Sequence, residues 1–176
     1  TIKKQPSPIK IKNTDPYSRF IMKIIENNGT VREPVSKEEE LHVIRHSAAH
    51  VMAQAIKRLY PDAHFAYGPA TEMGFYYDVD LGSVKLADGD LGKIEAEMKK
   101  IVKENLSIKP FILPREEAVK LMQERGEIYK VEHIADLPES EPISFYQQGE
   151  YIDMCVGPHV MYTKAVKAFK LTQVSG

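Results

Sequence analysis

The chain has 176 residues, 43% of them hydrophobic, so it can bury a core of its own, and its length fits one domain or one domain with a small appendage. Its 24 basic residues are balanced by 25 acidic ones, and the formal net charge of −1 excludes the strongly basic signature of a non-specific nucleic-acid binder. No apolar stretch reaches transmembrane length, no signal-peptide pattern begins the chain, and the single cysteine cannot form an internal disulfide. We therefore expect a cytoplasmic protein with no membrane contact and only local contacts to RNA.

Residues 1–35 are expected to form an N-terminal extension or the remnant of a preceding module. Residues 3–16 are polar and contain prolines, and the apolar segment 19–25 predicts a strand or a short helix that ends in an Asn-Asn-Gly turn. The chain lacks an initiator methionine and stops abruptly at Gly176, which suggests an excised fragment. The main domain is expected over residues 36–176.

The next segment predicts the most regular helix of the chain, between Ser36 and Pro61. Ser36 and Glu39 have the form of a capping box. One apolar stripe consists of Leu41, Ile44, Ala48, Val51, Met52, Ala55 and Leu59. At about 100° per residue, His46 and His50 fall on a different stripe, which predicts an exposed functional pair rather than two core histidines. Two solvent-exposed histidines without a function are the competing interpretation.

Shorter elements follow this helix. In chain order, the sequence predicts strands at 64–67 and 74–79, a helix at 91–105, a strand at 111–113, a helix at 114–123, and strands at 128–133, 142–147 and 150–155. Gly68 and Pro69 mark a turn after the first strand, and Gly126 ends the second of these helices. This order predicts an α+β fold in which an antiparallel sheet packs on helices as a two-layer sandwich.

Two pairs of metal-binding residue types stand far apart in the chain, each with a spacing of four. His46 and His50 lie on the predicted helix, whereas Cys155 and His159 follow a strand and are separated by a Gly-Pro turn. Three imidazoles and one thiol are the ligand types of a tetrahedral zinc site, and a loose fourth ligand would leave a position for water or substrate. A Cys-His nucleophilic pair is an alternative, although no cysteine-protease signature surrounds it.

Four segments carry a resemblance to a known family. They are Ile-Arg-His-Ser-Ala-Ala-His at 44–50, Gly-Pro-Ala-Thr-Glu-Met-Gly-Phe-Tyr-Tyr-Asp at 68–78, Arg-Gly-Glu-Ile-Tyr-Lys-Val at 125–131, and Tyr-Ile-Asp-Met-Cys-Val-Gly-Pro-His-Val at 151–160. Together they resemble the N-terminal editing domain of bacterial-type threonyl-tRNA synthetase over residues 40–176. The segment 169–176 is similar to the one that leads into that family's aminoacylation core. The small TGS domain that precedes the editing domain in the family is not recognisable in residues 1–35.

The resemblance implies an aminoacyl-tRNA deacylase that removes serine mistakenly attached to threonine tRNA. Its partners would be the serine-carrying acceptor end of threonine tRNA and the remainder of the synthetase chain. Carried over by position, His46 or His50 would orient or deprotonate the attacking water. Lys130 matches a family lysine near the attacked ester, and could stabilise the oxyanion. The competing interpretation of Lys130 is a surface lysine.

Three further residues match family positions. Asp153 would hold the serine amino group or a histidine tautomer, and Tyr77 would line the substrate pocket. Cys155 would be a metal ligand or a pocket wall that limits side-chain size. The alternatives are a turn residue for Asp153 and a half-buried strand aromatic for Tyr77.

The resemblance leaves the metal open. Related alanyl-type editing domains hold zinc with this quartet, whereas threonyl-type domains work with the same residues and no essential metal, so we expect no required cofactor and a site that is compatible with zinc. Local RNA contacts are expected from Arg45, Arg58, Lys99 and Lys100, with plain surface as the alternative. Two other functions remain open: a free-standing alanyl-type trans-editing deacylase, and a non-catalytic tRNA-binding or regulatory module.

Overall fold

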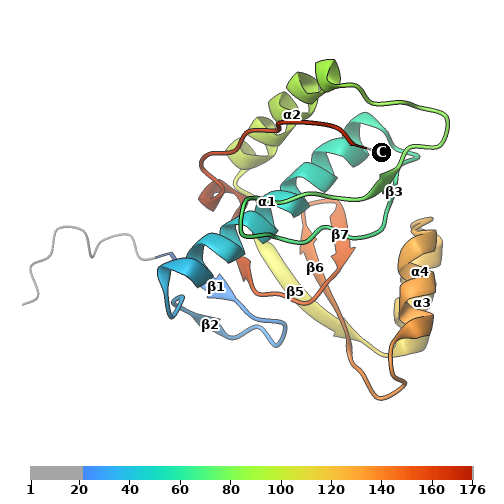
Figure 1. Cartoon of the computed structure of the whole chain (residues 1–176). Coiled ribbons are helices and arrows are strands. Elements are labelled where there is room, and N and C mark those ends of the chain that lie inside the picture. Colours follow the sequence, from blue (N-terminus) through green and yellow to red (C-terminus); the bar gives the residue numbers. More distant parts are fainter. Residues whose placement is uncertain (1–21, 176) are drawn as a thin grey trace, which may run out of the picture.

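The structure, a computed structural model, describes residues 22–175. The polar segment 3–16 and the first residues of the predicted element 19–25 lie outside this range. Within it, α1 (Lys37–Leu59) is the long central helix, and the other elements are arranged around it (Figure 1). No helix in this part of the chain is both long and apolar enough to cross a membrane.

Helix α1 begins and ends as the sequence predicts, but it is more deeply buried. The Ser36 hydroxyl accepts a hydrogen bond from the Glu39 backbone N–H at 3.1 Å and so caps the first turn. Every residue from Ser47 to Ile56 is buried, and α2 (Leu91–Glu104) and β8 (His159–Val160) both pack against the helix. The prediction of an exposed histidine pair is therefore wrong: His50 is only 2% exposed.

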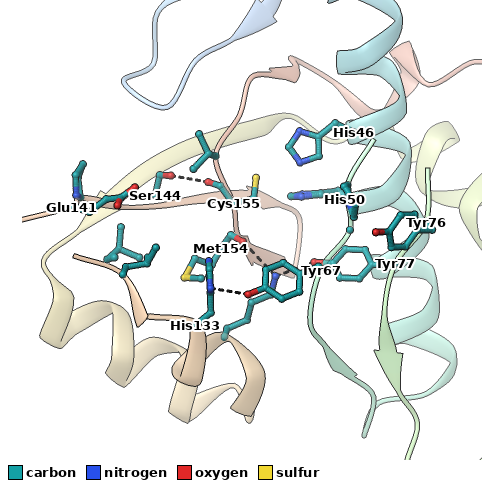
Figure 2. Close-up of a pocket in the computed structure, with 17 residues that line it drawn as sticks. His46, His50, Tyr67, Tyr76, Tyr77, His133, Glu141, Ser144, Met154 and Cys155 are labelled. Atoms are coloured by element: carbon teal, nitrogen blue, oxygen red, sulfur yellow. Dashed lines mark hydrogen bonds between the residues drawn. The ribbon is translucent and has the colours of Figure 1, made fainter. Parts of the chain in front are cut away.

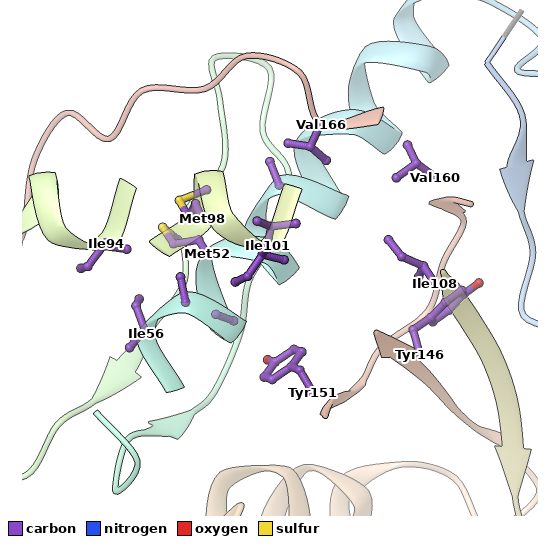
Figure 3. Close-up of a cluster of buried hydrophobic side chains, with 14 of the residues drawn as sticks. Met52, Ile56, Ile94, Met98, Ile101, Ile108, Tyr146, Tyr151, Val160 and Val166 are labelled. Carbon is purple, nitrogen blue, oxygen red and sulfur yellow. The ribbon is translucent and has the colours of Figure 1, made fainter. Parts of the chain in front are cut away.

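The reason lies in the small side chains of α1. Ala48, Ala49, Ala53 and Ala55 are all buried and allow neighbouring elements to approach the helix from several sides. The main core then fills the space between α1, α2 and the strands, and Figure 3 shows side chains from both helices within it, among them Met52, Met98 and Ile101. Full burial of such side chains stabilises the fold by about 1.5–3 kcal/mol each. Amphipathic periodicity alone does not reveal a helix that is covered on more than one face.

The strands form three small antiparallel sheets. The first contains β5 (Ile108–Leu113), β6 (Ile143–Gln148) and β7 (Tyr151–Met154), in that order. The second pairs β3 (His64–Phe65) with β4 (Val79–Asp80), and the third has the order β2 (Val31–Arg32), β1 (Ile24–Ile25), β8. The predicted α+β class with antiparallel strand pairing is confirmed, and the strands are divided among three small sheets where the sequence predicted one.

The N-terminal hairpin packs on the predicted main domain. Ile24 of β1 is fully buried and pairs with Val160 of β8. Residues 24–32 therefore share a sheet with a strand from the far end of the chain. The boundary between residues 35 and 36 stays a prediction.

A second, smaller hydrophobic core lies between helices α3 (Arg115–Glu124) and α4 (Ile128–Asp136) and the sheet of β5, β6 and β7. It contains side chains of both helices and of β6, with Met122, Ile134 and Phe145 at its centre. Gly126, at a φ of +70°, makes the turn between the two helices. The predicted strand at 128–133 is wrong, because this segment forms α4.

Two local signals compete in this segment. Ile128, Tyr129 and Val131 favour a strand by propensity. However, Val131 and Ile134 are three residues apart and both contact the second core, as the period of a helix requires. Tertiary packing on α3 therefore decides the outcome. Lys130 of this helix is buried, and its ammonium contacts the Tyr77 hydroxyl.

Candidate active site

The four residues of the predicted quartet come together in space. His46 and His50 extend from α1, Cys155 follows β7, and His159 lies on β8, and their ligand atoms all lie within 4.8 Å of one another. The ring centroids of His46 and His50 lie 4.1 Å and 4.2 Å from that of His159. The central helix and a strand some 110 residues later in the chain thus build one cluster.

His159 is held on both sides of its ring. Its Nδ1 lies 3.0 Å from the hydroxyl of Ser47, and its Nε2 lies 3.2 Å from the sulfur of Cys155. The same Ser47 hydroxyl accepts a hydrogen bond from the Val160 backbone N–H at 3.0 Å. Ser47 therefore links α1 to β8 and fixes the orientation of the imidazole.

A second group of polar side chains lies directly behind His50. The Asp153 carboxylate is 3.0 Å from the Lys130 ammonium and 3.4 Å from Nε2 of His50. Its Oδ2 also accepts hydrogen bonds from the hydroxyls of Tyr77 and Tyr151. Because the Lys130 ammonium and two tyrosine hydroxyls donate to this buried carboxylate, its charge is compensated even though it is only 2% exposed.

A cavity of about 450 Å³ opens beside these groups, within the usual range of small-molecule sites. His46, His50 and Cys155 line one end of it, and Tyr67 and His133 lie toward the other (Figure 2). The Tyr67 hydroxyl and Nδ1 of His133 are 2.8 Å apart and join the β3–β4 connection to α4. The cavity therefore lies between the main core and the smaller α3–α4 core.

Burial sets the protonation states of the cluster. It lowers the pKa of His46 and lowers those of His50 and His159 well below their usual value, and the neighbouring imidazoles add to the effect. Burial also raises the pKa of the Cys155 thiol well above its usual range. At neutral pH the imidazoles are neutral and can accept a proton, whereas a protonated Cys155 is a poor nucleophile.

The residues are suitable for a zinc ion. Tetrahedral zinc with N and S ligands separates those ligands by roughly 3.3–3.6 Å, so side-chain shifts of about 1 Å would close the cluster around the ion. Within residues 22–175, Nδ1 of His50 is buried without a hydrogen-bond partner. A site built from imidazole and thiol ligands also binds zinc in preference to magnesium or calcium, which favour oxygen ligands.

The structure also places the remaining predicted residues. Lys130 is buried and Tyr77 is partly buried, and both line the cavity, whereas Asp153 lies behind its wall. Of the residues expected to contact RNA, Arg45 donates hydrogen bonds to the backbone oxygens of Thr71 and Glu72. Arg58 is paired with three carboxylates and Lys100 with one of these, while Lys99 is exposed. Arg58 is thus not free to bind phosphate.

Sequence reasoning missed two residues of the site. Ser47 directly follows His46, so its place inside the His-x-x-x-His motif was a signal that it lies near the cluster. Tyr151 precedes Asp153 by two positions on β7, and residues two apart on a strand share a face. Both are buried polar residues that contact predicted site residues.

Comparison with known proteins identifies the relatives of the chain. The family described as threonyl and alanyl tRNA synthetase second additional domain matches residues 143–176. The chain is 61% identical over 139 residues to the threonine–tRNA ligase of Clostridioides difficile strain 630, covering 79% of this chain and 22% of that protein. It is 59% identical over 132 residues to that of Acetivibrio thermocellus (75% and 21%), and 55% identical over 153 residues to that of Carboxydothermus hydrogenoformans (86% and 24%). The chain thus spans about a fifth to a quarter of these relatives, and the resemblance seen in its motifs is confirmed.

Proposed function

We propose, from this confirmed resemblance to the editing domain of threonyl-tRNA synthetases, that the pocket hydrolyses the ester joining serine to the 3′ end of threonine tRNA. The observation that carries the proposal is the meeting of three imidazoles and a thiol at the end of a cavity lined by Lys130. A pocket sized for threonine gains only about 1–3 kcal/mol over serine, which lacks one methyl. A second site that hydrolyses the smaller ester supplies the missing discrimination.

In the proposed reaction a water molecule binds beside His46. As its oxygen attacks the ester carbonyl carbon, the neutral imidazole takes one of its protons and the carbonyl oxygen becomes an oxyanion. The positive charge of Lys130 stabilises that oxyanion. The bond to the ribose oxygen then breaks, and the imidazolium returns its proton to the leaving oxygen. Serine and a tRNA with a free terminal hydroxyl are released.

We assign the proton transfer to His46 rather than His50. A general base works best with a pKa near the working pH, and the pKa of His46 is lowered less than that of the fully buried His50. His50 instead orients the water, and Asp153 holds His50. The Lys130 ammonium and two tyrosine hydroxyls already occupy the Asp153 carboxylate, which favours this role over binding the serine amino group.

The remaining residues define the shape of the site. Cys155 forms a wall that limits the size of the side chain that can enter, and Tyr77 lines the cavity while its hydroxyl connects Lys130 to Asp153. Where zinc is bound, the ligands would be His46, His50, Cys155 and His159. If one of these four ligands were released, the ion would have an open position and would hold a more acidic water in the same pocket.

A deacylation assay with the 176-residue chain tests the proposal. Release of serine is measured from seryl-tRNA(Thr) and from seryl-tRNA(Ala), each with and without a chelator. We expect faster release from threonine tRNA, since the curated relatives named above are threonine–tRNA ligases. Preference for alanine tRNA would instead identify an alanyl-type deacylase, and loss of activity with chelator would make the metal part of the site.

Single substitutions connect the activity to the pocket. We expect His46→Ala to lower the rate by about 10²–10⁴-fold, as for other general bases. His42→Ala is the matched control, because His42 is an exposed histidine one turn earlier on α1. If His46→Ala and His50→Ala both leave hydrolysis unchanged, the catalytic assignment fails and a non-catalytic tRNA-binding module is the better description.

A further inference from the structure

The turn that carries Cys155 and His159 rests on a side chain from the N-terminal hairpin. The Gly157 backbone N–H donates a hydrogen bond to Oδ1 of Asn27 at 2.8 Å. The Tyr146 hydroxyl donates to the same oxygen at 2.8 Å, with the Ile25 carbonyl oxygen as a second acceptor at 3.2 Å. One amide oxygen therefore joins the hairpin, strand β6 and the turn.

The backbone of the turn at Gly157 packs directly against the Tyr146 side chain. A Cβ atom added to Gly157 would lie 1.9 Å from the Tyr146 hydroxyl oxygen, so only glycine allows this approach. The Tyr146 ring is 1% exposed, and its centroid is 4.5 Å from that of His159. A shift of Tyr146 would therefore move both the turn and an imidazole of the quartet.

The backbone of the hairpin contacts the same segment. Ile25 pairs with His159, and Ile24 pairs with Val160, in the antiparallel ladder between β1 and β8. Strand β8 is only two residues long, so this ladder and the Ser47 hydroxyl supply much of what fixes it. The hairpin thus reaches His159 through the backbone and Cys155 through the Gly157 turn.

We propose that Asn27 is a positioning residue for the turn from Cys155 to His159, and that the hairpin of residues 24–32 is an integral part of the pocket rather than an attached extension. Asn27 touches neither the cavity nor the quartet, and it acts through Gly157 and Tyr146. The effect on catalysis rests on the function proposed above. The effect on the turn itself does not.

The chain offers a direct probe of this turn, because Cys155 is its single cysteine. Cys155 is partly exposed at the end of the cavity, and its sulfur lies 3.2 Å from Nε2 of His159, so the rate of alkylation by iodoacetamide in the folded protein reports how firmly the turn holds the thiol against that imidazole. Loss of a buried hydrogen bond shifts an opening equilibrium by about fivefold to tenfold, so we expect Asn27→Ala to accelerate alkylation by about that factor. Asn28→Ala is the matched control: Asn28 lies in the same turn of the hairpin, is exposed, and within residues 22–175 its side chain accepts a hydrogen bond only from the Thr30 backbone N–H.

Two further variants separate positioning from simple destabilisation. Asn27→Asp keeps an oxygen that accepts from both donors and should return alkylation to the wild-type rate. Tyr146→Phe removes only the hydroxyl and should accelerate alkylation even if Asn27→Ala does not fold. Equal rates for Asn27→Ala and Asn28→Ala, or no rescue by Asn27→Asp, would overturn the proposal.

The catalytic consequence is read from steady-state deacylation. We expect Asn27→Ala to lower kcat by about tenfold with little change in KM, because the substrate still binds while the quartet is displaced. If the wild-type chain does not hydrolyse seryl-tRNA, the proposed function fails but the alkylation series still decides the role of Asn27. If the wild type is active and both readouts are unchanged in Asn27→Ala, only the positioning role fails.

Discussion

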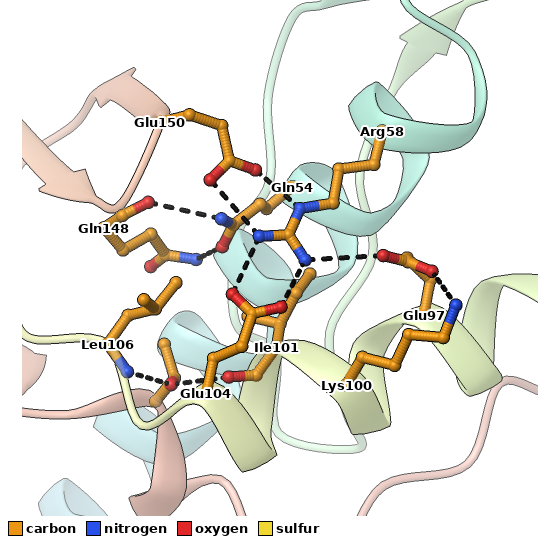
Figure 4. A network of polar contacts seen from close by, with 10 residues as sticks. Gln54, Arg58, Glu97, Lys100, Ile101, Glu104, Leu106, Gln148 and Glu150 are labelled. Atoms are coloured by element: carbon orange, nitrogen blue, oxygen red, sulfur yellow. Dashed lines mark hydrogen bonds and ion pairs between the residues drawn. The ribbon is translucent and has the colours of Figure 1, made fainter.

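Helix α1 contacts two charged networks that are built in opposite ways. In the pocket, the buried pair of Lys130 and Asp153 lies behind His50, with side chains only 6% and 3% exposed. Near the C-terminal end of α1, Arg58 holds Glu97, Glu104 and Glu150 in a surface network, and Glu150 is 58% exposed (Figure 4). The two networks have similar N···O distances but very different access to water.

The difference shows what burial demands of a charge. Each donor of the Lys130 ammonium has an acceptor, namely Asp153, the Tyr77 hydroxyl at 3.1 Å and the Met154 carbonyl oxygen at 3.4 Å. A buried ion is tolerated only when such contacts replace its hydration. The carboxylates around Arg58 keep part of their hydration, so protein contacts need not replace all of it. We conclude that the buried pair fixes geometry for the pocket, whereas the surface network clamps α1 to α2 and to the β6–β7 turn.

The largest expected effect is the loss of one member of the buried pair. Lys130→Met leaves the Asp153 carboxylate buried without a counter-charge, so we expect the free energy of unfolding to fall by about 3–5 kcal/mol. The measurement is urea denaturation followed by circular dichroism. The double variant Lys130→Met/Asp153→Asn removes both charges and should regain most of that stability without regaining deacylation. A loss below about 1 kcal/mol in the single variant would place the pair in the same class as a surface ion pair.

The two networks also show how far the sequence could predict this molecule. His46 and His50 are four residues apart, as are Cys155 and His159. Such local spacing is visible in the sequence, so it predicts the four residues of the quartet directly. The contacts of Arg58 join residues up to 92 positions apart, and no local pattern distinguishes such an arginine from one that is free to bind RNA. Pairing at that distance is set by packing, which a single sequence does not display.

The contrast between local patterns and long-range contacts also explains which elements of the fold and which residues of the site the sequence predicts. Helices α1, α2 and α3 and strands β5 to β7 follow from local periodicity and end signals. Propensity predicts a strand at 128–133, because the β-branched and aromatic residues of this segment outweigh its helical spacing, whereas packing makes it helix α4. Asn27 gave no signal of its role, since its oxygen meets a backbone N–H that is 130 residues away.

A substitution in the surface network should have a smaller effect. Arg58→Met removes the cation, but water can hydrate Glu104 and Glu150 while Glu97 keeps its ion pair with Lys100, so we expect a loss of about 1 kcal/mol in the free energy of unfolding. Deacylation should be unchanged, because Arg58 does not line the cavity. The same urea denaturation measures the stability, and Lys120→Met is the control for removing a more exposed cation from another helix. A loss as large as that of Lys130→Met would erase the distinction between the networks.

Salt should separate the two networks further. The Debye length falls from about 10 Å at 0.1 M to about 3 Å at 1 M ionic strength, and screening requires access of the ions. We therefore expect the stability difference between wild type and Arg58→Met to shrink by about half at 1 M NaCl. The difference between wild type and Lys130→Met should stay nearly constant. Equal shrinkage of both differences would show that water and ions reach the Lys130–Asp153 pair.

The smallest expected effect is the change in the free energy of unfolding at acidic pH. The Arg58 guanidinium lowers the pKa of Glu150 from 4.5 to about 2. Since the folded-state pKa is the lower one, the contribution of Glu150 to stability is fully present above about pH 4.5 and is lost as pH falls toward 2. The free energy of unfolding of wild type should thus exceed that of Glu150→Gln at pH 6, and the two values should converge near pH 2. Because Glu150 is more than half exposed, solvent screening keeps the difference small, and a gap that persists at pH 2 would mean that packing rather than charge holds this side chain.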